Sequence, residues 1–222
     1  MATGRASSAD STRLRDEVCE ELRDHIIAGR LQPGHRLVER DLAEEFGVSR
    51  VPVREAIQVL IGEGFVEALS PRRIVVKQVS RRDVEELFSV REALEVQATR
   101  EAALRADAAG LRELERLVEQ ARRATTSGKP ERISRANAAF HHHIVTLADN
   151  RLLASLLRPL EGRLRWLFQQ IDNPGHTWEE HHALYEAIAS RNADAAADHS
   201  LRHVRYNREI ALKLLYGDKD PR

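Results

Sequence analysis

The chain has 222 residues, of which 42% are hydrophobic, and its 35 basic residues are balanced by 35 acidic ones. This length allows one or two domains, and the hydrophobic share excludes a wholly disordered chain. The balanced charge gives no sign of nucleic-acid binding by itself, and the single cysteine excludes a disulfide framework or a multi-cysteine zinc site. The polar N-terminus lacks a signal-peptide core, and no apolar run reaches the ~18 residues of a membrane span. We therefore expect a cytoplasmic protein without membrane contact.

The N-terminal region begins with residues 1–10, which are small and polar and are predicted to form a disordered tail. A helix is predicted next, because Leu14, Val18, Leu22 and Ile26 recur at steps of four residues. Two short helices and a β-hairpin are predicted to follow, at 39–46, 50–63, 65–69 and 74–79.

From residue 80 onward the sequence shows only helical spacing. Ser80 and Asp83 form a capping-box pattern at the start of this region, and Pro159 is expected to kink one of its helices. The predicted helices span 81–105, 107–126, 131–149, 151–171, 177–191 and 194–216. Residues 80–216 therefore form an all-α bundle, and residues 217–222 a polar tail.

The two short helices have the pattern of a helix-turn-helix. Ala43 provides the small side chain where the two helices cross, and Gly47 the permissive backbone of the turn. Ser49 can cap the second helix, which has Pro52 in its first turn. Apolar residues occupy the positions that such a pair must bury: Leu42, Phe46, Val48, Val53 and Ala56. With the hairpin behind it, this pattern predicts a winged helix-turn-helix domain over 11–79; the alternative is an ordinary helical hairpin.

The arginines of this domain indicate how it could contact DNA. Arg50 and Arg54 share one face of the N-terminal part of the second helix, the part that recognition helices present to the major groove. Arg40 opens the preceding helix, where it can meet a phosphate, and Arg72 and Arg73 lie at the hairpin tip. Each arginine taken alone could equally be a solvated surface charge.

The histidines of the C-terminal region suggest a metal site. Asn137 and His141 share a helical face, and His181 and His203 lie on two other predicted helices. Three imidazoles from three helices can converge in a bundle core and bind zinc or a similar divalent ion. Spacing across separate helices leaves open the alternative of a stable bundle without metal.

The N-terminal region strongly resembles the winged-helix domain of GntR-family bacterial transcription regulators. The stretches that carry the resemblance are 26–34, 39–43, 48–56 and 60–64. It implies that Arg40, Ser49, Arg50 and Arg54 contact DNA. The wing of the family usually has an Arg-Gly pair at its tip, whereas here Arg72 is followed by Arg73 and Ile74.

The C-terminal region resembles the FadR-like branch of that family, through residues 137–141, Asn150, residues 180–188, Asp194 and His203. The resemblance implies an all-helical ligand domain. It also implies a divalent metal, zinc being our prediction, whose ligands are Asn137, His141, His181 and His203. Aspartate is the more familiar first ligand of the branch. His142, His143, His182 and His199 are expected at the surface or behind the ligands, although His182 would replace His181 if the register slipped, and His199 could face the site.

The effector implied by the resemblance is a small organic acid. Arg91 matches the arginine of the branch's pattern in residues 90–95 and is predicted to bind the effector, with Arg163, Arg165 and Tyr206 as weaker candidates. The predicted protein is thus a mainly α, homodimeric repressor without enzymatic activity that binds a palindromic operator in double-stranded DNA. One alternative is a metal-dependent hydrolase, disfavoured because no His-Glu-x-x-His motif is present and because Glu180 is expected to point away from the histidines. The other is an architectural DNA-binding dimer without effector.

Overall fold

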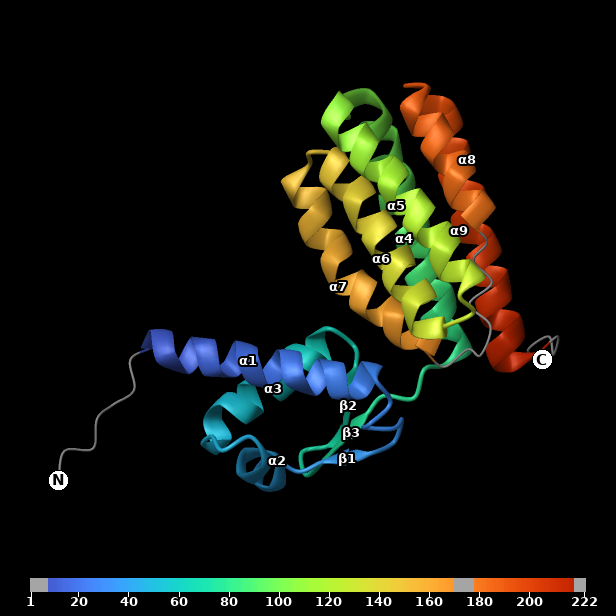
Figure 1. Ribbon diagram of the computed structural model, residues 1–222. Helices are drawn as coiled ribbons and strands as arrows, with labels where there is room; N and C mark the ends of the chain where they lie inside the picture. The colour runs from blue at the N-terminus through green and yellow to red at the C-terminus, as the bar shows by residue number, and fades with distance from the viewer. Residues whose placement is uncertain (1–7, 170–177, 218–222) are drawn as a thin grey trace. The chain divides into compact units, whose positions relative to one another are not determined.

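The computed structural model describes residues 8–169 and 178–217, and the chain divides between Val79 and Ser80 into two compact units (Figure 1). Unit 1 combines helices with a small sheet, and in unit 2 the described residues form helices alone. The predicted fold class, a mainly α protein with a winged helix-turn-helix followed by a helical bundle, is confirmed.

Unit 1 follows the predicted order, with one additional strand. Its elements are α1 (Ser8–Ile27), β1 (Arg36–Leu37), α2 (Glu39–Glu45), α3 (Arg50–Gly62), β2 (Val66–Ser70) and β3 (Arg73–Val76). The sheet has the order β1-β3-β2, and both pairings are antiparallel. The strand β1 was not predicted, because two residues are too few to show a period of two.

Helix α1 begins at Ser8, so the predicted tail of residues 1–10 was too long at its C-terminal end. Asp10 lies in the first turn of α1, where a carboxylate interacts favourably with the positive end of the helix dipole. Residues 1–7 lie outside the described residues.

The core of unit 1 lies where α1, α3 and the sheet meet. Leu22 and Ile26 of α1 are fully buried, as are Val53 and Ile57 of α3 and Val76 of β3. The stripe at steps of four on α1 is therefore the face that packs on α3. This packing directs the opposite face of α3 toward solvent.

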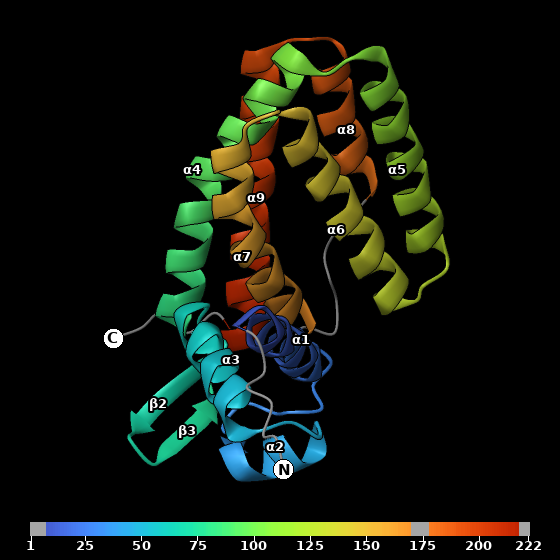
Figure 2. The ribbon, with the colours of Figure 1, turned by 90° about the vertical axis from the view of Figure 1, so that its left-hand side faces the viewer.

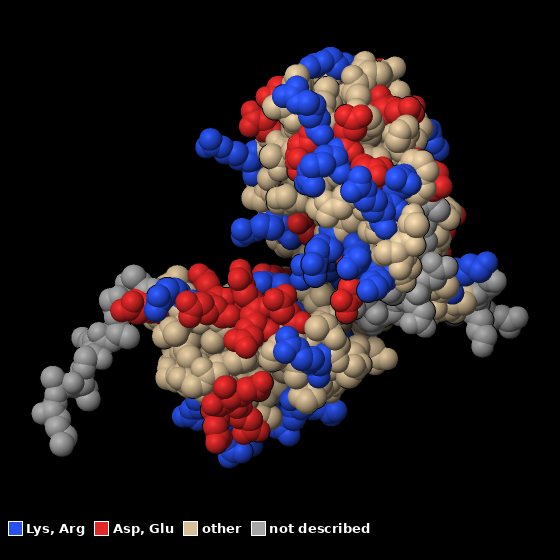
Figure 3. Space-filling model, viewed as in Figure 1, with Lys and Arg blue, Asp and Glu red and all other residues tan. Residues whose placement is uncertain are grey.

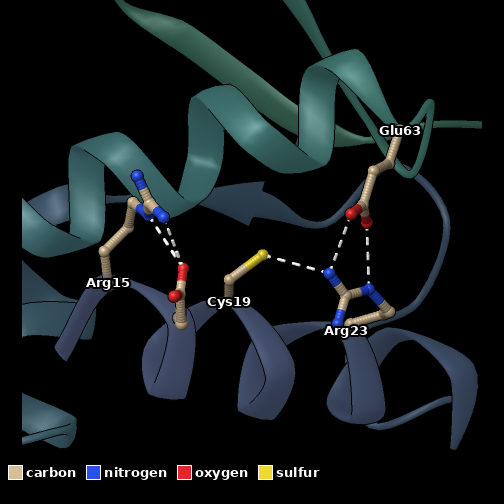
Figure 4. A network of polar contacts seen from close by, with 5 residues as sticks. Arg15, Cys19, Arg23 and Glu63 are labelled. Atoms are coloured by element: carbon tan, nitrogen blue, oxygen red, sulfur yellow. Dashed lines mark hydrogen bonds and ion pairs between the residues drawn. The ribbon is translucent and has the colours of Figure 1, made fainter. Parts of the chain in front are cut away.

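A polar network ties α1 to the end of α3 (Figure 4). The Arg23 guanidinium donates from Nε and Nη2 to the two carboxylate oxygens of Glu63, both at 2.9 Å. Nη2 also lies 3.2 Å from Cys19 Sγ, and Cys19 is buried. Burial raises the pKa of the Cys19 thiol to about 11, against the opposing effect of the Arg23 charge.

Unit 2 is a bundle of long helices whose ends lie close to the predicted ones. They are α4 (Arg81–Arg105), α5 (Ala108–Thr126), α6 (Pro130–Leu147), α7 (Arg151–Gln169), α8 (Trp178–Ala189) and α9 (Ala193–Tyr216). The capping box is present, since the Ser80 hydroxyl accepts from the Asp83 backbone N–H and the Asp83 carboxylate accepts from that of Ser80. Pro159 lies inside α7, and the kink there stays a prediction. Residues 170, 171 and 177, which were predicted to be helical, lie outside the described residues.

Helices α4 and α9 lie side by side in both views (Figures 1 and 2). Two ion pairs join them, Arg100 with Asp194 at 2.5 Å and Arg205 with Glu92 at 3.0 Å. Phe140 of α6 is fully buried in an apolar cluster to which α5, α8 and α9 also contribute. Among the described helices, none has the length and apolar character needed to cross a bilayer.

Cys19 provides a direct probe of unit 1, because it is the chain's single cysteine. Cys19 is 4% exposed and its thiol has a pKa of about 11, so near neutral pH the thiol is protonated and shielded from reagents. Only the thiolate form reacts readily. We expect an aromatic disulfide reagent to label the native protein slowly and the denatured protein at once, measured by absorbance. Glu63→Gln should speed native labelling by loosening the Arg23 contact, whereas Glu55→Gln, on the exposed face of α3, should not. Rapid labelling of the native chain would contradict the buried network.

Candidate functional site

Helix α3 presents an exposed basic face at its N-terminal end. Arg50 and Arg54 are exposed, whereas Pro52, Val53 and Ala56 are buried, so the predicted division of this helix into two faces is present. Figure 3 shows that acidic side chains gather over α1, the helix that carries Asp16, Glu17, Glu20, Glu21 and Asp24. The near-neutral charge of unit 1 is therefore unevenly distributed, and α3 is better suited to phosphate than α1.

Ser49 occupies the N-cap position of α3 in an extended conformation, but its side chain makes no capping hydrogen bond. The prediction that its hydroxyl caps the helix was wrong for a local reason. A cap accepts from the N–H of the second or the third helical residue, and the third is Pro52, which has no N–H, so one of the two donors is absent. The Ser49 hydroxyl is therefore exposed and is not used by the helix.

Arg54 is held by a carboxylate of the preceding helix. Its Nε lies 2.9 Å from Glu39 Oε1, and its Nη2 lies 2.8 Å from Glu39 Oε2. These hydrogen bonds lower the pKa of the Glu39 carboxyl and raise that of Arg54. Sequence reasoning missed Glu39, because residues 15 positions apart meet only once the angle between α2 and α3 is known.

The other predicted DNA contacts are also at the surface. Arg40 is exposed on α2 and donates from Nε to its neighbour Asp41 at 3.0 Å. Arg72 and Arg73 are exposed at the turn between β2 and β3. Arg36 of β1 donates from Nη2 to the Arg72 carbonyl at 3.0 Å, so a side chain braces this tip, which lacks the glycine usual in the family.

The structure brings the three predicted histidines together in the core of unit 2. His141 comes from α6, His181 from α8 and His203 from α9, and one ligand nitrogen of each lies within 4.8 Å of the others. The Nε2 atoms of His141 and His203 are 3.2 Å apart, and His181 and His203 are 2% and 5% exposed. Phe140 stacks on the His181 ring at a centroid distance of 4.5 Å. This three-histidine cluster could hold a metal ion.

Asn137 lies one helical turn before His141 on α6. Its Oδ1 atom is buried and has no hydrogen-bond partner among the described residues. A buried amide oxygen without a partner is costly, and this one lies on the helix that carries His141. Its assignment as a fourth ligand stays a prediction.

Two residues that contact His203 were not predicted. Glu180 Oε2 lies 2.9 Å from His203 Nδ1, and Asn207 Nδ2 lies 3.0 Å from His203 Nε2. The expectation that Glu180 points away from the histidines was wrong. It does leave α8 in a direction different from that of His181, but that direction leads to His203 on α9. Asn207 lies four residues after His203, a spacing that places both on one face of a helix, and sequence reasoning did not use this spacing.

The remaining described histidines lie outside the cluster. His142 is exposed and lies 3.6 Å from Glu161, and His143 Nε2 lies 2.9 Å from the Gly110 carbonyl. His182 packs edge-on against Trp178, and His199 is half-buried. The positions of these four histidines match the expectation that they stay out of the ligand set.

Arg91 is a buried residue of α4 and not a solvated surface arginine. Only 3% of it is exposed, and its guanidinium lies 4.8 Å from the centre of the Phe88 ring. Its Nε and Nη2 donate to the Glu95 carboxylate at 2.6 and 3.0 Å, while Nη1 is buried without a partner. Sequence reasoning treated Arg91 as a lone cation and missed Glu95. Of the weaker candidates, Arg163 is half-buried, and Arg165 and Tyr206 are exposed.

Two family models match the two units. The model described as bacterial regulatory proteins, gntR family, matches residues 14–76, and the model of the FCD domain matches residues 86–206. The second match alone covers more than half of the chain.

Known relatives match over most of their length. The chain is 31% identical over 205 residues to the HTH-type transcriptional regulator YdhC of Bacillus subtilis, a match that covers 90% of this chain and 92% of the relative. It is 28% identical to the HTH-type transcriptional regulator McbR of Escherichia coli, over 80% of this chain and 83% of that protein. These relatives are regulators, and the comparisons give no support to the hydrolase alternative.

Solved structures agree with the architecture. The E. coli McbR/YncC structure has a TM-score of 0.76 at 25% identity and covers 90% of this chain and 97% of its own. A GntR transcriptional regulator from Rhodococcus sp. RHA1 has a TM-score of 0.74 at 26% identity and covers 89% and 97%. The chain therefore belongs to the GntR family of DNA-binding bacterial transcription regulators, with a winged helix-turn-helix unit followed by an FCD domain.

Proposed function

We propose that this regulator binds a palindromic operator as a homodimer and that a small carboxylate, bound at a divalent metal in unit 2, weakens that binding. The observation that carries the proposal is the convergence of His141, His181 and His203 from three helices. A bundle that served only as a dimerisation scaffold would have no need of three ligand nitrogens at its centre. This argument disfavours the architectural alternative.

Contact with DNA is assigned to the exposed face of α3 and its surroundings. Arg50 and Arg54 stand where recognition helices read base edges in the major groove. The free hydroxyl of Ser49 and the guanidinium of Arg40 are suited to phosphates, and Arg72 and Arg73 are suited to the backbone or the minor groove beside them.

A homodimer follows from the small size of one reading unit. One winged helix buries too little surface for operator affinity, so two units on a two-fold site are expected. Leu152 and Leu156 lie one turn apart on α7 and are 71% and 51% exposed. We assign this aliphatic strip to contact with a second copy of the chain, since such strips commonly mark interfaces.

Replacing either reading arginine tests the DNA contact. On an operator obtained by selection from random duplexes, Arg50→Ala and Arg54→Ala should each cost about 1–3 kcal/mol of binding free energy, because each removes a bidentate base contact. Fluorescence anisotropy gives the affinity, and titration should end at two chains per duplex. Arg13→Ala, an exposed arginine of α1, is the matched control. Unchanged binding by both variants would remove α3 as the reader.

The donor set fits a zinc ion. Three imidazole nitrogens converge in unit 2, and we assign the Asn137 amide oxygen, which is buried without a partner among the described residues, as the fourth of a ligand set that zinc accepts. When bound, the divalent ion would supply a positive charge that attracts an anion, because all four ligands are neutral. Glu180 would accept a hydrogen bond from His203 Nδ1 and so leave Nε2 of that ring directed at the cluster. Asn207 Nδ2, which lies 3.0 Å from this Nε2 atom, would have to give it up to the ion.

Metal content can be measured independently of DNA binding. Purified protein should carry about one zinc per chain by elemental mass spectrometry, because the donor set forms a single four-ligand site, and His203→Ala should lose it. Glu180→Gln should weaken zinc binding by about 10- to 100-fold in competition with a chromogenic chelator, because it removes the partner that orients His203. Glu179→Gln, the exposed neighbour, is the control. Failure of the wild type to take up zinc even on reconstitution would overturn the metal assignment.

The effector is assigned to Arg91 and the metal together. Glu95 already neutralises part of the Arg91 charge, but the buried Nη1 atom retains an unused N–H pair. A carboxylate can accept from this group without displacing Glu95. Control of DNA binding then requires that the bound acid favour one arrangement of the two reading units over another, through the short junction Val79-Ser80-Arg81.

Titration of operator-bound protein with a panel of organic and sugar acids tests this coupling. An active acid should lower operator affinity by roughly 5- to 150-fold, a usual range for coupling between two sites. Arg91→Ala should weaken the response to the acid while zinc content stays unchanged. Arg82→Ala, an exposed arginine of the same helix, should behave as wild type. An acid that binds tightly in unit 2 and leaves operator affinity unchanged would sink the proposed regulation.

A further inference from the structure

The ion pair between Glu39 and Arg54 lies on the face of unit 1 assigned to DNA. The Arg54 side chain is 59% exposed and that of Glu39 26% exposed. Exposed ion pairs contribute little to folding stability, because solvent screens them and two long side chains must be ordered. Stability therefore gives no sufficient reason for a carboxylate at the edge of a DNA-binding surface.

The geometry of the pair leaves one edge of the guanidinium free. Glu39 occupies the side edge, formed by Nε and Nη2. The end edge, formed by Nη1 and the second N–H of Nη2, has no partner among the described residues. Two parallel N–H groups at the end of an arginine match the O6 and N7 acceptors of guanine in the major groove.

We propose that Glu39 is a positioning residue that fixes Arg54 for reading a guanine; this inference rests on the proposed contact of Arg54 with DNA. A free arginine side chain must lose much rotamer freedom when it binds a base. Glu39 orders the Arg54 side chain before DNA arrives. The loss of rotamer entropy therefore occurs on folding and no longer reduces the free energy of base recognition.

The same carboxylate works against non-specific binding. Non-specific affinity arises from cations that meet phosphates, and a neutralised Arg54 contributes less to it. Arg50 makes no bidentate ion pair of this kind among the described residues, although its charge also helps to lower the pKa of the Glu39 carboxyl. Glu39 thus lowers the affinity for DNA of any sequence and raises the preference for the operator, as a repulsive element in a specific interface does.

The test measures affinity for the selected operator and for a scrambled duplex of equal length. Glu39→Gln should lower operator affinity, leave scrambled affinity equal or higher, and reduce the ratio of the two by about tenfold, a typical part of what a bidentate guanine contact provides. Glu39→Asp keeps the charge but shortens the side chain by one methylene, so it should reduce the ratio as well. Glu44→Gln removes the same charge from the exposed surface of α2 and serves as the control.

Each outcome decides between the possibilities. If Glu39→Gln raises both affinities equally and Glu39→Asp behaves as wild type, Glu39 acts only as a repulsive charge and the inference fails. If Arg54→Ala lowers operator affinity while neither Glu39 variant alters the ratio, the inference also fails although the Arg54 contact survives. If Arg54→Ala itself leaves operator binding unchanged, the proposed DNA contact fails first. In an Arg54→Ala background, Glu39→Gln should have no more effect than Glu44→Gln, and thermal unfolding confirms that each variant is folded.

Discussion

Burial of polar side chains at the centre of unit 2 is the constraint on which its architecture depends. Arg91, His181, His203 and Asn207 are each no more than 5% exposed. Removing such groups from water is unfavourable unless each finds a partner, so the helices must be rotated to supply partners. Glu95 and the face of Phe88 serve Arg91, and Glu180 and Asn207 serve His203. Among the described residues, Nη1 of Arg91 and Oδ1 of Asn137 and of Asn207 are buried without a hydrogen-bond partner. Replacing buried polar groups by an apolar core of the same volume is often neutral or stabilising, so stability alone does not account for this interior.

Unit 1 differs from unit 2 in where its polar side chains lie. Its interior is apolar, with Leu22, Val53 and Ile57 fully buried, and its polar interactions are exposed or, as for Arg23 with Glu63, part-buried. There, pairing decides which charges remain available to a ligand. Arg23 is paired with Glu63, and Arg54 is paired with Glu39 along one edge of its guanidinium. Arg50 forms no ion pair among the described residues. A unit with almost balanced charge can therefore still present a selective basic surface.

Sequence reasoning was most successful where structure is decided locally. The capping box at Ser80, the stripe on α1 and the glycine at the helix-turn-helix turn are all read within a few residues, and the corresponding elements form. Local rules failed where two of them competed. Ser49 has the identity of a cap, but Pro52 removes one of the two N–H groups from which a cap can accept. The strand β1 is two residues long and is specified by its partner β3, not by its own period.

The site residues divide in a similar way. Histidines are rare enough to be noticed, so three ligand candidates were found, and Asn137 was added as a ligand by the family resemblance. The carboxylates were missed, because glutamate is common on solvated helix faces. Glu39, Glu95 and Glu180 each accompany a residue that was predicted: Arg54, Arg91 and His203. Only the pairing of Arg91 with Glu95, four residues apart on one helix, could have been read from spacing. The other two depend on how separate helices are rotated and crossed, which no single helix encodes.

These three carboxylates change what the cationic and ligand residues can do. A lone arginine binds any anion, whereas an arginine held along one edge offers only its other edge and a reduced charge. A histidine held at Nδ1 offers only Nε2 and only in one direction. In each case the carboxylate weakens the attraction of its partner for a ligand and fixes the direction in which that partner can bind. For a DNA-binding regulator this exchange is favourable, because its task is to distinguish one operator from many competing sites. Such discrimination depends on differences in affinity, which a weaker but directed contact provides better than a strong and undirected one.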